Sequence, residues 1–152
     1  MDYVKFGVED HIGTVTLAKP PVNAMNLQMY HEIADTFHQI NDNPDVWVVV
    51  FRAEGRFFSV GNDVNDFSGD YNLDYIRQID TSIRSVFECK VPVIAAVQGA
   101  AIGGGFTMVS ACDIVVAAQK TKFFIPEAKL GKVGGSAGAS FSLPQKVVRY
   151  MA

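Results

Sequence analysis

The 152-residue sequence lacks the features that mark secreted, membrane-spanning and nucleic-acid-binding proteins. It does not open on a charged segment followed by an apolar run, and no apolar stretch approaches the ~20 residues that cross a bilayer as a helix. Its formal net charge is −3, and its lysines and arginines form no basic stripe. We therefore expect a cytoplasmic protein that binds a small molecule and neither a membrane nor nucleic acid.

Cysteine is scarce, and the common cofactor motifs are missing. Cys89 and Cys112 lie in apolar periodic segments and form no C-x-x-C pair, which favours buried free thiols over a disulfide or a metal site. The sequence has no G-K-[ST] motif and no G-x-G-x-x-G after a strand, so nucleotide binding of those kinds is unsupported. It also predicts no metal.

Apolar residues are abundant, at 49% of the chain, which predicts one sizeable core and a single domain over residues 1–152. Strand-like and helix-like segments alternate, which indicates an α/β fold with parallel pairing. The expected strands are 3–8 and 12–18, joined as a hairpin by a turn at 10–11, then 46–51 and 93–97, each covered on both faces, a buried 113–117 and a short 122–125. The expected helices run to residue 40 from an Asn26 cap, to residue 87 from an Asn72 cap, through residue 112 after the glycines at 103–105, and over 145–151.

Three segments that follow predicted strands carry candidate chemistry, because loops at strand ends hold the sites of such folds. They are 57–63, 98–106 and 124–131. Consecutive glycines at 103–105 leave backbone N–H groups uncovered at the positive end of a helix dipole, which suits an anion or a developing oxyanion. Glu127 follows an apolar run, where a carboxylate tends to be held partly protonated, as a proton-transfer group requires.

Each segment also has a purely structural interpretation. The glycines at 103–105 equally permit close packing of a helix on a strand. Glu127 after Pro126 is common at an exposed helix start. Residues 60–63 fit a β-turn with a helix cap, and Asp63 and Asp66 are interpreted as helix-start residues. No single motif decides between the two interpretations.

The order and spacing of the motifs closely resemble the enoyl-CoA hydratase/isomerase (crotonase) superfamily over nearly the whole chain. Residues 58–63 match its F-x-A-G-x-D loop, with Val60 in place of alanine. Residues 99–105 match its G-x-x-x-G-G-G loop, and residues 126–131 match its Pro-Glu followed by Leu-Gly. Residues 21–26 are similar to its N-A-[LM] segment, whose loop lies near the CoA nucleotide.

The resemblance implies a fold, a site and a substrate. The fold is expected to be a crotonase-like spiral of β-β-α units, and the substrate an acyl-CoA thioester, with no cofactor because coenzyme A is part of the substrate. The backbone N–H groups of Asn62 and Gly104 are the implied oxyanion donors, and Glu127 is the implied general acid/base. The implied substrate-binding residues are Asn23, Ala24, Val60, Gly61, Asp63, Gly103, Thr107 and Gly131. A full-length member is expected to form a homotrimer or a dimer of trimers.

Two departures from the family pattern bear on the reaction. Hydratases of the family generally carry a second glutamate at the position of Thr107, on the first helical turn, where side chains lean toward the N-terminus. Hydration is helped by two carboxylates, whereas moving a double bond needs one, so the single Glu127 favours isomerase-like chemistry. Gly134 stands where the family usually has a proline.

Two alternatives stay open. Family chains continue beyond residue 152 through helices that complete the acyl pocket and form trimer contacts, so the C-terminal helical region is expected to be missing. The chain would then be a catalytically weak or inactive CoA-ester-binding or scaffolding module. Residues 134–138 also match the G-x-S-x-G elbow of serine hydrolases, although the last aspartate, Asp113, and all three histidines, His11, His31 and His38, precede it.

Overall fold

The computed structural model describes residues 1–66 and 73–130. Its frame is a five-stranded sheet in the order β1-β2-β3-β4-β6. The strands are β1 (Val4–Glu9), β2 (Ile12–Leu17), β3 (Val48–Ala53), β4 (Val93–Val97) and β6 (Ile114–Ala117). β1 and β2 are antiparallel, and every other neighbouring pair is parallel. A second sheet pairs β5 (Ala100–Ile102) with β7 (Lys122–Phe124) in parallel, so the predicted α/β fold with parallel pairing is confirmed.

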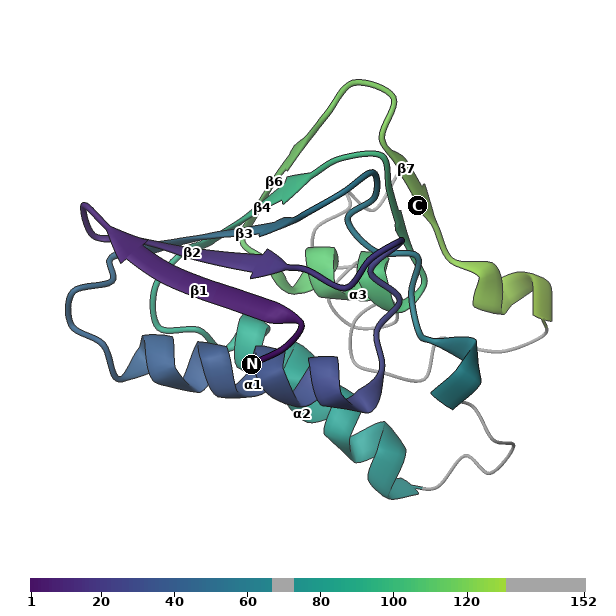
Figure 1. The fold of residues 1–152 in the computed structure, drawn as a ribbon, viewed down its shortest axis with the longest axis horizontal. Helices are drawn as coiled ribbons and strands as arrows, with labels where there is room; N and C mark the ends of the chain where they lie inside the picture. The colour runs from purple at the N-terminus through teal and green to yellow at the C-terminus, as the bar shows by residue number, and fades with distance from the viewer. Residues whose placement is uncertain (67–72, 131–152) are drawn as a thin grey trace, which may run out of the picture.

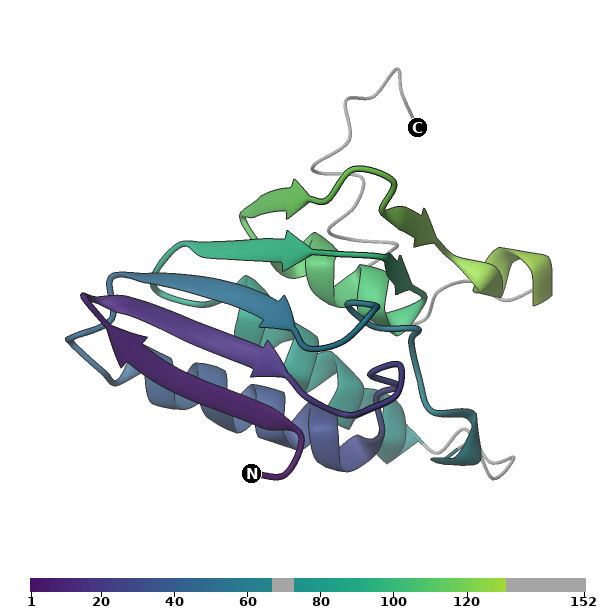
Figure 2. The same cartoon turned by 45° about the horizontal axis from the view of Figure 1, so that its top comes forward.

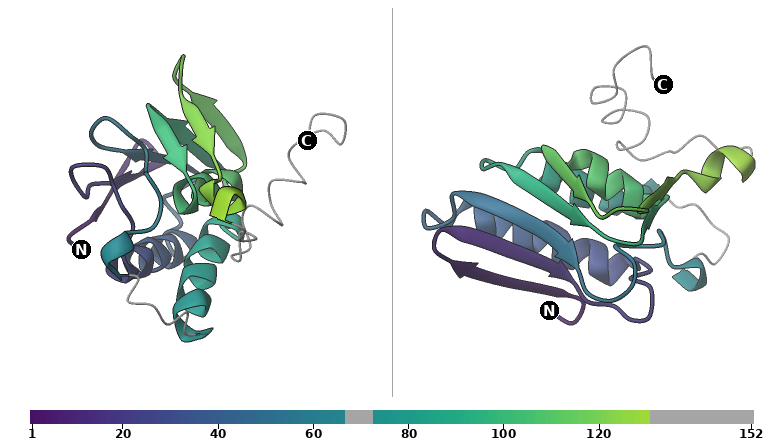
Figure 3. Two further views of the ribbon diagram at one scale, coloured as in Figure 1. Left: turned by 90° about the vertical axis from the view of Figure 1, so that its right-hand side faces the viewer. Right: turned by 90° about the horizontal axis from the view of Figure 1, so that it is seen from above.

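The helices lie on one side of the large sheet. They are α1 (Leu27–Asn41), α2 (Leu73–Phe87) and α3 (Gly104–Ala111), with short 3₁₀ turns η1 (Val64–Asp66) and η2 (Pro126–Leu130). Figure 1 and the left panel of Figure 3 show α1 and α2 beneath the sheet, with α3 on the same side below β4 and β6. The core fills the space between this sheet face and the helices. There Phe51 packs edge-on against Phe37 and Phe58, with ring centroids 5.6 and 5.5 Å apart.

Local sequence signals place the first elements as predicted. Asp10 and His11 adopt left-handed φ values of 48° and 64°, which a two-residue hairpin turn of type I′ requires at both central positions. The Asn26 side chain accepts a hydrogen bond from the Met29 N–H at 3.0 Å and caps the start of α1. The hairpin and the Asn26 cap are thus confirmed. The Asn72 cap and the helix expected over 145–151 lie outside the described residues.

The burial predicted for the strands is wrong in part. Every residue of β6 is exposed, with Ile114 at 53% and Val116 at 59%, although 113–117 was expected to be a buried strand. β6 is the edge strand of the large sheet, so it has a neighbouring strand on one side only. β3 and β4 alternate between buried and less buried residues, so they are well covered on one face and not on both. An apolar β-branched run predicts a strand, whereas the burial of that strand depends on which distant segments pack against it.

Two boundaries also differ from the sequence-based expectation. β3 begins at Val48 rather than at residue 46. The preceding Trp47 donates its N–H to the His11 carbonyl at 2.9 Å and stacks its ring on His11. β5 lies inside the segment 98–106, which was expected to be a loop before its helix. Neither Cys89 nor Cys112 forms a disulfide, as predicted: Cys112 is buried and Cys89 half-buried, and burial raises the pKa of the Cys89 thiol.

The link between β4 and β5 brings the candidate segments together. Gly99 has a φ of 66°, and a Cβ added there would overlap the carbonyl oxygen of Arg56 in the loop after β3. Only glycine allows the two loops to approach this closely. Figure 2 shows the chain running from β4 through β5 into α3, so the start of α3 lies next to the loop after β3.

Candidate active site at the start of helix α3

The loop after β3 is tied to β5 through Ser59. The Ser59 N–H donates to the Ala100 carbonyl at 3.2 Å, and the Ile102 N–H donates to the Ser59 carbonyl at 3.0 Å. The Ser59 hydroxyl accepts from the Gly61 N–H at 3.1 Å and donates to the Asn23 carbonyl at 2.7 Å. This buried serine therefore sets the path of residues 59–61 toward α3.

The backbone of Asn62 is turned toward α3. The Met25 N–H donates to the Gly61 carbonyl, and the Met25 carbonyl accepts from the Asp63 N–H, both at 2.8 Å. The Gly61 carbonyl and the Asp63 N–H therefore point toward Met25. In extended backbone the N–H of the intervening residue points the other way. Among the described residues, none accepts a hydrogen bond from the Asn62 N–H. Gly61 has a φ of 96°, and a Cβ on it would stand 3.5 Å from the Gly104 nitrogen, so the two glycine loops touch.

The start of α3 presents uncovered backbone N–H groups. Gly103, at a φ of 50°, caps the helix without a side-chain hydrogen bond, and its own N–H donates to the Phe124 carbonyl at 2.8 Å. The first bond of the helix runs from the Thr107 N–H to the Gly103 carbonyl at 2.9 Å. The N–H groups of residues 104–106 therefore have no acceptor within the helix. They lie at the positive end of its dipole, where an anion is favoured.

The same glycines also allow close packing. A Cβ on Gly105 would stand 2.7 Å from the Ser59 Cβ, and one on Gly104 would stand 2.5 Å from Asn62 Oδ1. The close-packing interpretation of residues 103–105 is therefore confirmed, and their interpretation as an oxyanion site stays a prediction. The absence of side chains lets α3 approach the loop after β3, and this approach places the uncovered N–H groups beside Asn62.

Glu127, in η2, lies against the start of α3. Its Oε1 is 3.0 Å from the position that a Cβ on Gly103 would occupy. Its Oε2 is buried and has no hydrogen-bond partner among the described residues. A buried carboxylate oxygen without a partner is unfavourable, and such groups gather at functional sites. The structure thus brings Glu127, Gly104 and Asn62 into one site.

Tyr30 is a site residue that sequence reasoning missed. It lies in α1, where its hydroxyl donates to Asn62 Oδ1 at 2.6 Å and also lies against Gly104. Burial, with smaller contributions from the neighbouring Tyr75 and Glu127, raises the pKa of Tyr30, so its hydroxyl stays protonated. The available signal was a phenol on a buried face, since a buried Tyr O–H usually needs a polar partner.

Comparison with known proteins identifies the family. The model of the family described as enoyl-CoA hydratase/isomerase matches residues 7–152. This chain belongs to the enoyl-CoA hydratase/isomerase family. The crotonase-like fold expected from the sequence is therefore confirmed.

Individual relatives agree with this assignment. The chain is 35% identical over 144 residues to the (7aS)-7a-methyl-1,5-dioxo-2,3,5,6,7,7a-hexahydro-1H-indene-carboxyl-CoA hydrolase of Rhodococcus jostii, covering 92% of this chain and 56% of that protein. It is 35% identical over 127 residues to the carnitinyl-CoA dehydratase of Citrobacter koseri, covering 82% and 49%. The crystal structure of an enoyl-CoA hydratase/carnithine racemase from Magnetospirillum magneticum matches with a TM-score of 0.83 at 34% identity, covering 88% and 52%. The chain spans about half the length of these relatives.

Other residues that the family resemblance marks as substrate-binding hold the fold together. Asn23 is 2% exposed, and its amide donates to the carbonyls of Glu54 and Phe57 at 2.8 and 3.0 Å. Its side-chain oxygen accepts from the Lys19 N–H at 2.8 Å. The side chain of Asn23 therefore links the 19–25 segment to the loop after β3, and these contacts occupy both its amide and its oxygen.

The remaining predicted residues take varied positions. Ala24 is half-buried between Asn23 and Met25, and the Val60 N–H donates to the Val22 carbonyl at 3.2 Å. Thr107 is buried on the first turn of α3, within one turn of Gly104. Gly131 and the G-x-S-x-G segment at 134–138 lie outside the described residues.

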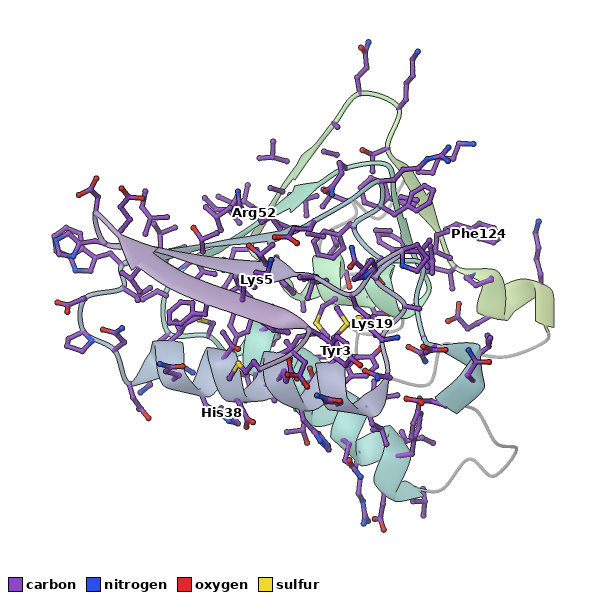
Figure 4. The ribbon with its side chains drawn as sticks, viewed as in Figure 1. Tyr3, Lys5, Lys19, His38, Arg52 and Phe124 are labelled. Carbon is purple, nitrogen blue, oxygen red and sulfur yellow. The ribbon has the colours of Figure 1, made fainter. Side chains whose placement is uncertain are left out.

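Asp63 forms an ion pair with Lys19 and does not contact Glu127. Its Oδ2 accepts from Lys19 Nζ at 2.6 Å, and its Oδ1 accepts from the Asn65 N–H at the start of η1 at 3.1 Å. Figure 4 shows Lys19 beside Tyr3, over whose ring its Nζ lies at 5.6 Å. Asp66 accepts from the Leu27 N–H at 3.0 Å, so it caps α1 rather than its own turn. Glu127 therefore has no rival carboxylate in these two residues.

The Lys19–Asp63 pair makes stability depend on pH. The hydrogen bond from Lys19, and then that from the Asn65 N–H, lower the pKa of Asp63 below its usual 3.8. A lowered folded-state pKa stabilises the protein above pH 3.8, and this contribution is lost as the pH falls through the folded-state value. Lys19→Met is expected to lower the free energy of unfolding by about 0.5–1 kcal/mol at neutral pH, with a smaller difference in acid. Urea unfolding of the wild type and Lys19→Met from pH 7 to pH 3 measures this difference in unfolding free energy, and Lys5→Met is the control at an exposed lysine. A difference between wild type and Lys19→Met that does not change with pH would contradict the prediction.

Within the described parts of the chain, no group of three or more His, Cys, Asp or Glu side chains converges as a metal site. No helix there is long and apolar enough to cross a membrane.

Proposed function

We propose that this chain binds an acyl-CoA thioester with its thioester oxygen between the N–H groups of Asn62 and Gly104. Glu127 takes a proton from the α-carbon and returns it. As the C–H bond breaks, its electron pair moves toward the thioester oxygen, where the two N–H donors stabilise the negative charge. Preorganised donors of this kind contribute roughly 3–4 kcal/mol each.

One observation carries this proposal. Glu127 Oε2 is buried without a described partner, directly beside the start of α3, where the cap residue Gly103 makes no side-chain hydrogen bond. Proton transfer needs a carboxylate with a free oxygen, and enolate formation needs donors with free N–H groups. Glu127 supplies the free carboxylate oxygen and residues 62 and 104 supply the N–H donors, all close to Gly103. The interpretation of Glu127 as a surface glutamate does not account for its unpartnered oxygen. Its interpretation as a helix-start residue does not account for it either.

Double-bond migration is the favoured reaction. In a 3-enoyl thioester, Glu127 removes a proton from carbon 2, the double bond shifts to carbons 2 and 3, and the proton is delivered to carbon 4. One carboxylate suffices and no water is consumed. Hydration gains from a second carboxylate, and Thr107 stands at the helical position where that group would lie.

Thr107→Glu tests the choice between isomerisation and hydration. The wild-type chain is expected to isomerise 3-enoyl-CoA faster than it hydrates 2-enoyl-CoA, and Thr107→Glu is expected to raise hydration about tenfold or more. The 2-enoyl absorbance reports both reactions, after calorimetry has shown that each thioester binds. Efficient hydration by the wild type with no gain in Thr107→Glu overturns the isomerase preference. Binding without α-proton exchange favours the non-catalytic CoA-ester-binding module instead.

Hydrolysis is the second candidate, because the Rhodococcus jostii relative is named a CoA hydrolase. Water would add to the thioester carbonyl carbon while Glu127 takes its proton, and the same two N–H donors would stabilise the resulting oxyanion. The C–S bond would then break, and the departing CoA sulfur would receive the proton from Glu127. Oxygen-18 from labelled water in a carboxylic acid product would distinguish this reaction from isomerisation.

A further inference from the structure

Tyr30 and Asn62 form a polar side-chain pair that proton transfer by Glu127 does not use. The Tyr30 hydroxyl donates to Asn62 Oδ1 at 2.6 Å, and Tyr30 is completely buried in α1. Both oxygens lie 2.5 Å from the position that a Cβ on Gly104 would occupy. The pair therefore lies directly against the first residue of α3.

This location sets the orientation of the Asn62 amide. The uncovered N–H groups at the start of α3 attract a carbonyl oxygen and repel an amide N–H. Oδ1 therefore faces Gly104 and Tyr30, and Nδ2, on the other branch of the planar amide, is turned away from them. No described residue accepts a hydrogen bond from Nδ2, and Asn62 is partly exposed.

We propose that Nδ2 of Asn62 is a specificity-determining donor, held in place by Tyr30, that selects acyl-CoA thioesters with a second oxygen close to the thioester. A keto or hydroxyl group on the acyl chain is the chemistry that fits. The inference rests on the proposed function, because a thioester oxygen at the Asn62 N–H brings the adjoining acyl carbons near the side chain of the same residue. A hydrocarbon chain there displaces water from Nδ2 and offers no acceptor in its place, which costs affinity.

Acetoacetyl-CoA and butyryl-CoA are matched probes, because they differ only at carbon 3, a keto group in one and a methylene in the other. We expect the 152-residue chain to bind acetoacetyl-CoA about fivefold more tightly in calorimetry, the effect of one neutral hydrogen bond. Asn62→Ala and the isosteric Asn62→Asp are expected to abolish this preference. Tyr30→Phe is expected to reduce it, because the amide is no longer held. Asn65→Ala makes the same chemical change on the exposed η1 turn and is expected to keep the wild-type ratio.

The outcomes separate the inference from the function on which it rests. Equal affinities for the two thioesters in the wild type, or a preference that survives in both Asn62 variants, overturns the role of Nδ2. An unchanged preference in Tyr30→Phe overturns the positioning role of Tyr30. Failure of the wild type to bind either thioester overturns the proposed function itself. Ratios are compared within each variant, so a general loss of affinity does not imitate the expected result.

Discussion

Glu127→Gln is expected to lower the exchange of the α-proton of a bound acyl-CoA thioester by at least about 10²-fold, the usual contribution of a general base. Glutamine keeps the shape of the side chain against Gly103 but cannot accept a proton. The measurement is deuterium incorporation from heavy water into a saturated acyl-CoA, followed by mass spectrometry. CoA-ester affinity is expected to change little, because the carboxylate acts on the proton rather than on the nucleotide.

The matched control is Glu9→Gln, which makes the same change on an exposed residue of β1. It is expected to exchange protons at the wild-type rate. Thermal unfolding of both variants separates a chemical effect from a folding defect. Near wild-type exchange in a folded Glu127→Gln variant would show that another group moves the proton.

Gly104→Ala is expected to lower turnover about 10²- to 10³-fold, the loss that follows removal of one oxyanion donor. The added methyl group would stand 2.5 Å from both Asn62 Oδ1 and the Tyr30 hydroxyl and 3.1 Å from Met25 Cε. Alanine favours a helix over glycine by about 1 kcal/mol, but overpacking typically costs about 1–3 kcal/mol, so the start of α3 must shift. The donated N–H then moves from the position where charge develops. Turnover is expected to fall more than CoA-ester affinity, because the interaction strengthens in the transition state.

Gly7→Ala is the control for this substitution, since a Cβ on Gly7 meets no atom within 4 Å. Steady-state kinetics give kcat and KM separately for both variants. A rise in KM with kcat unchanged would mean that Gly104 serves substrate binding alone. Unchanged kinetics in Gly104→Ala would remove its N–H from the proposed oxyanion pair.

Short-range signals were sufficient for the elements that frame the site. The hairpin turn needs left-handed backbone at two adjacent residues, and Asp10 and His11 adopt it. The start of α1 needs a side-chain acceptor, which Asn26 supplies. Each feature depends on groups a few residues apart, so the local sequence specifies it. The motif order likewise predicted which loops meet, because parallel strands deliver their following loops to one edge of a sheet.

Long-range signals were missed where the partner is remote in sequence. The phenol of Tyr30 finds its acceptor 32 residues away, so helical periodicity showed a buried face and not the hydrogen bond to Asn62. The amide of Asn23 likewise binds the carbonyls of residues 54 and 57, which its place in the 21–26 motif does not show. The exposure of β6 could not be seen in its apolar residues either, because they show strand propensity and not what lies over the strand.

By itself, the sequence determined the family, the α/β alternation and the identities of Glu127, Asn62 and Gly104 as one candidate set. Only the tertiary structure decided how that set is assembled. It placed Glu127 against Gly103, left one carboxylate oxygen without a described partner, paired Asp63 with Lys19 and brought Tyr30 to the start of α3. The physical reason is that residue type and spacing specify local backbone conformation, whereas the contacts of a side chain depend on which distant segments pack beside it.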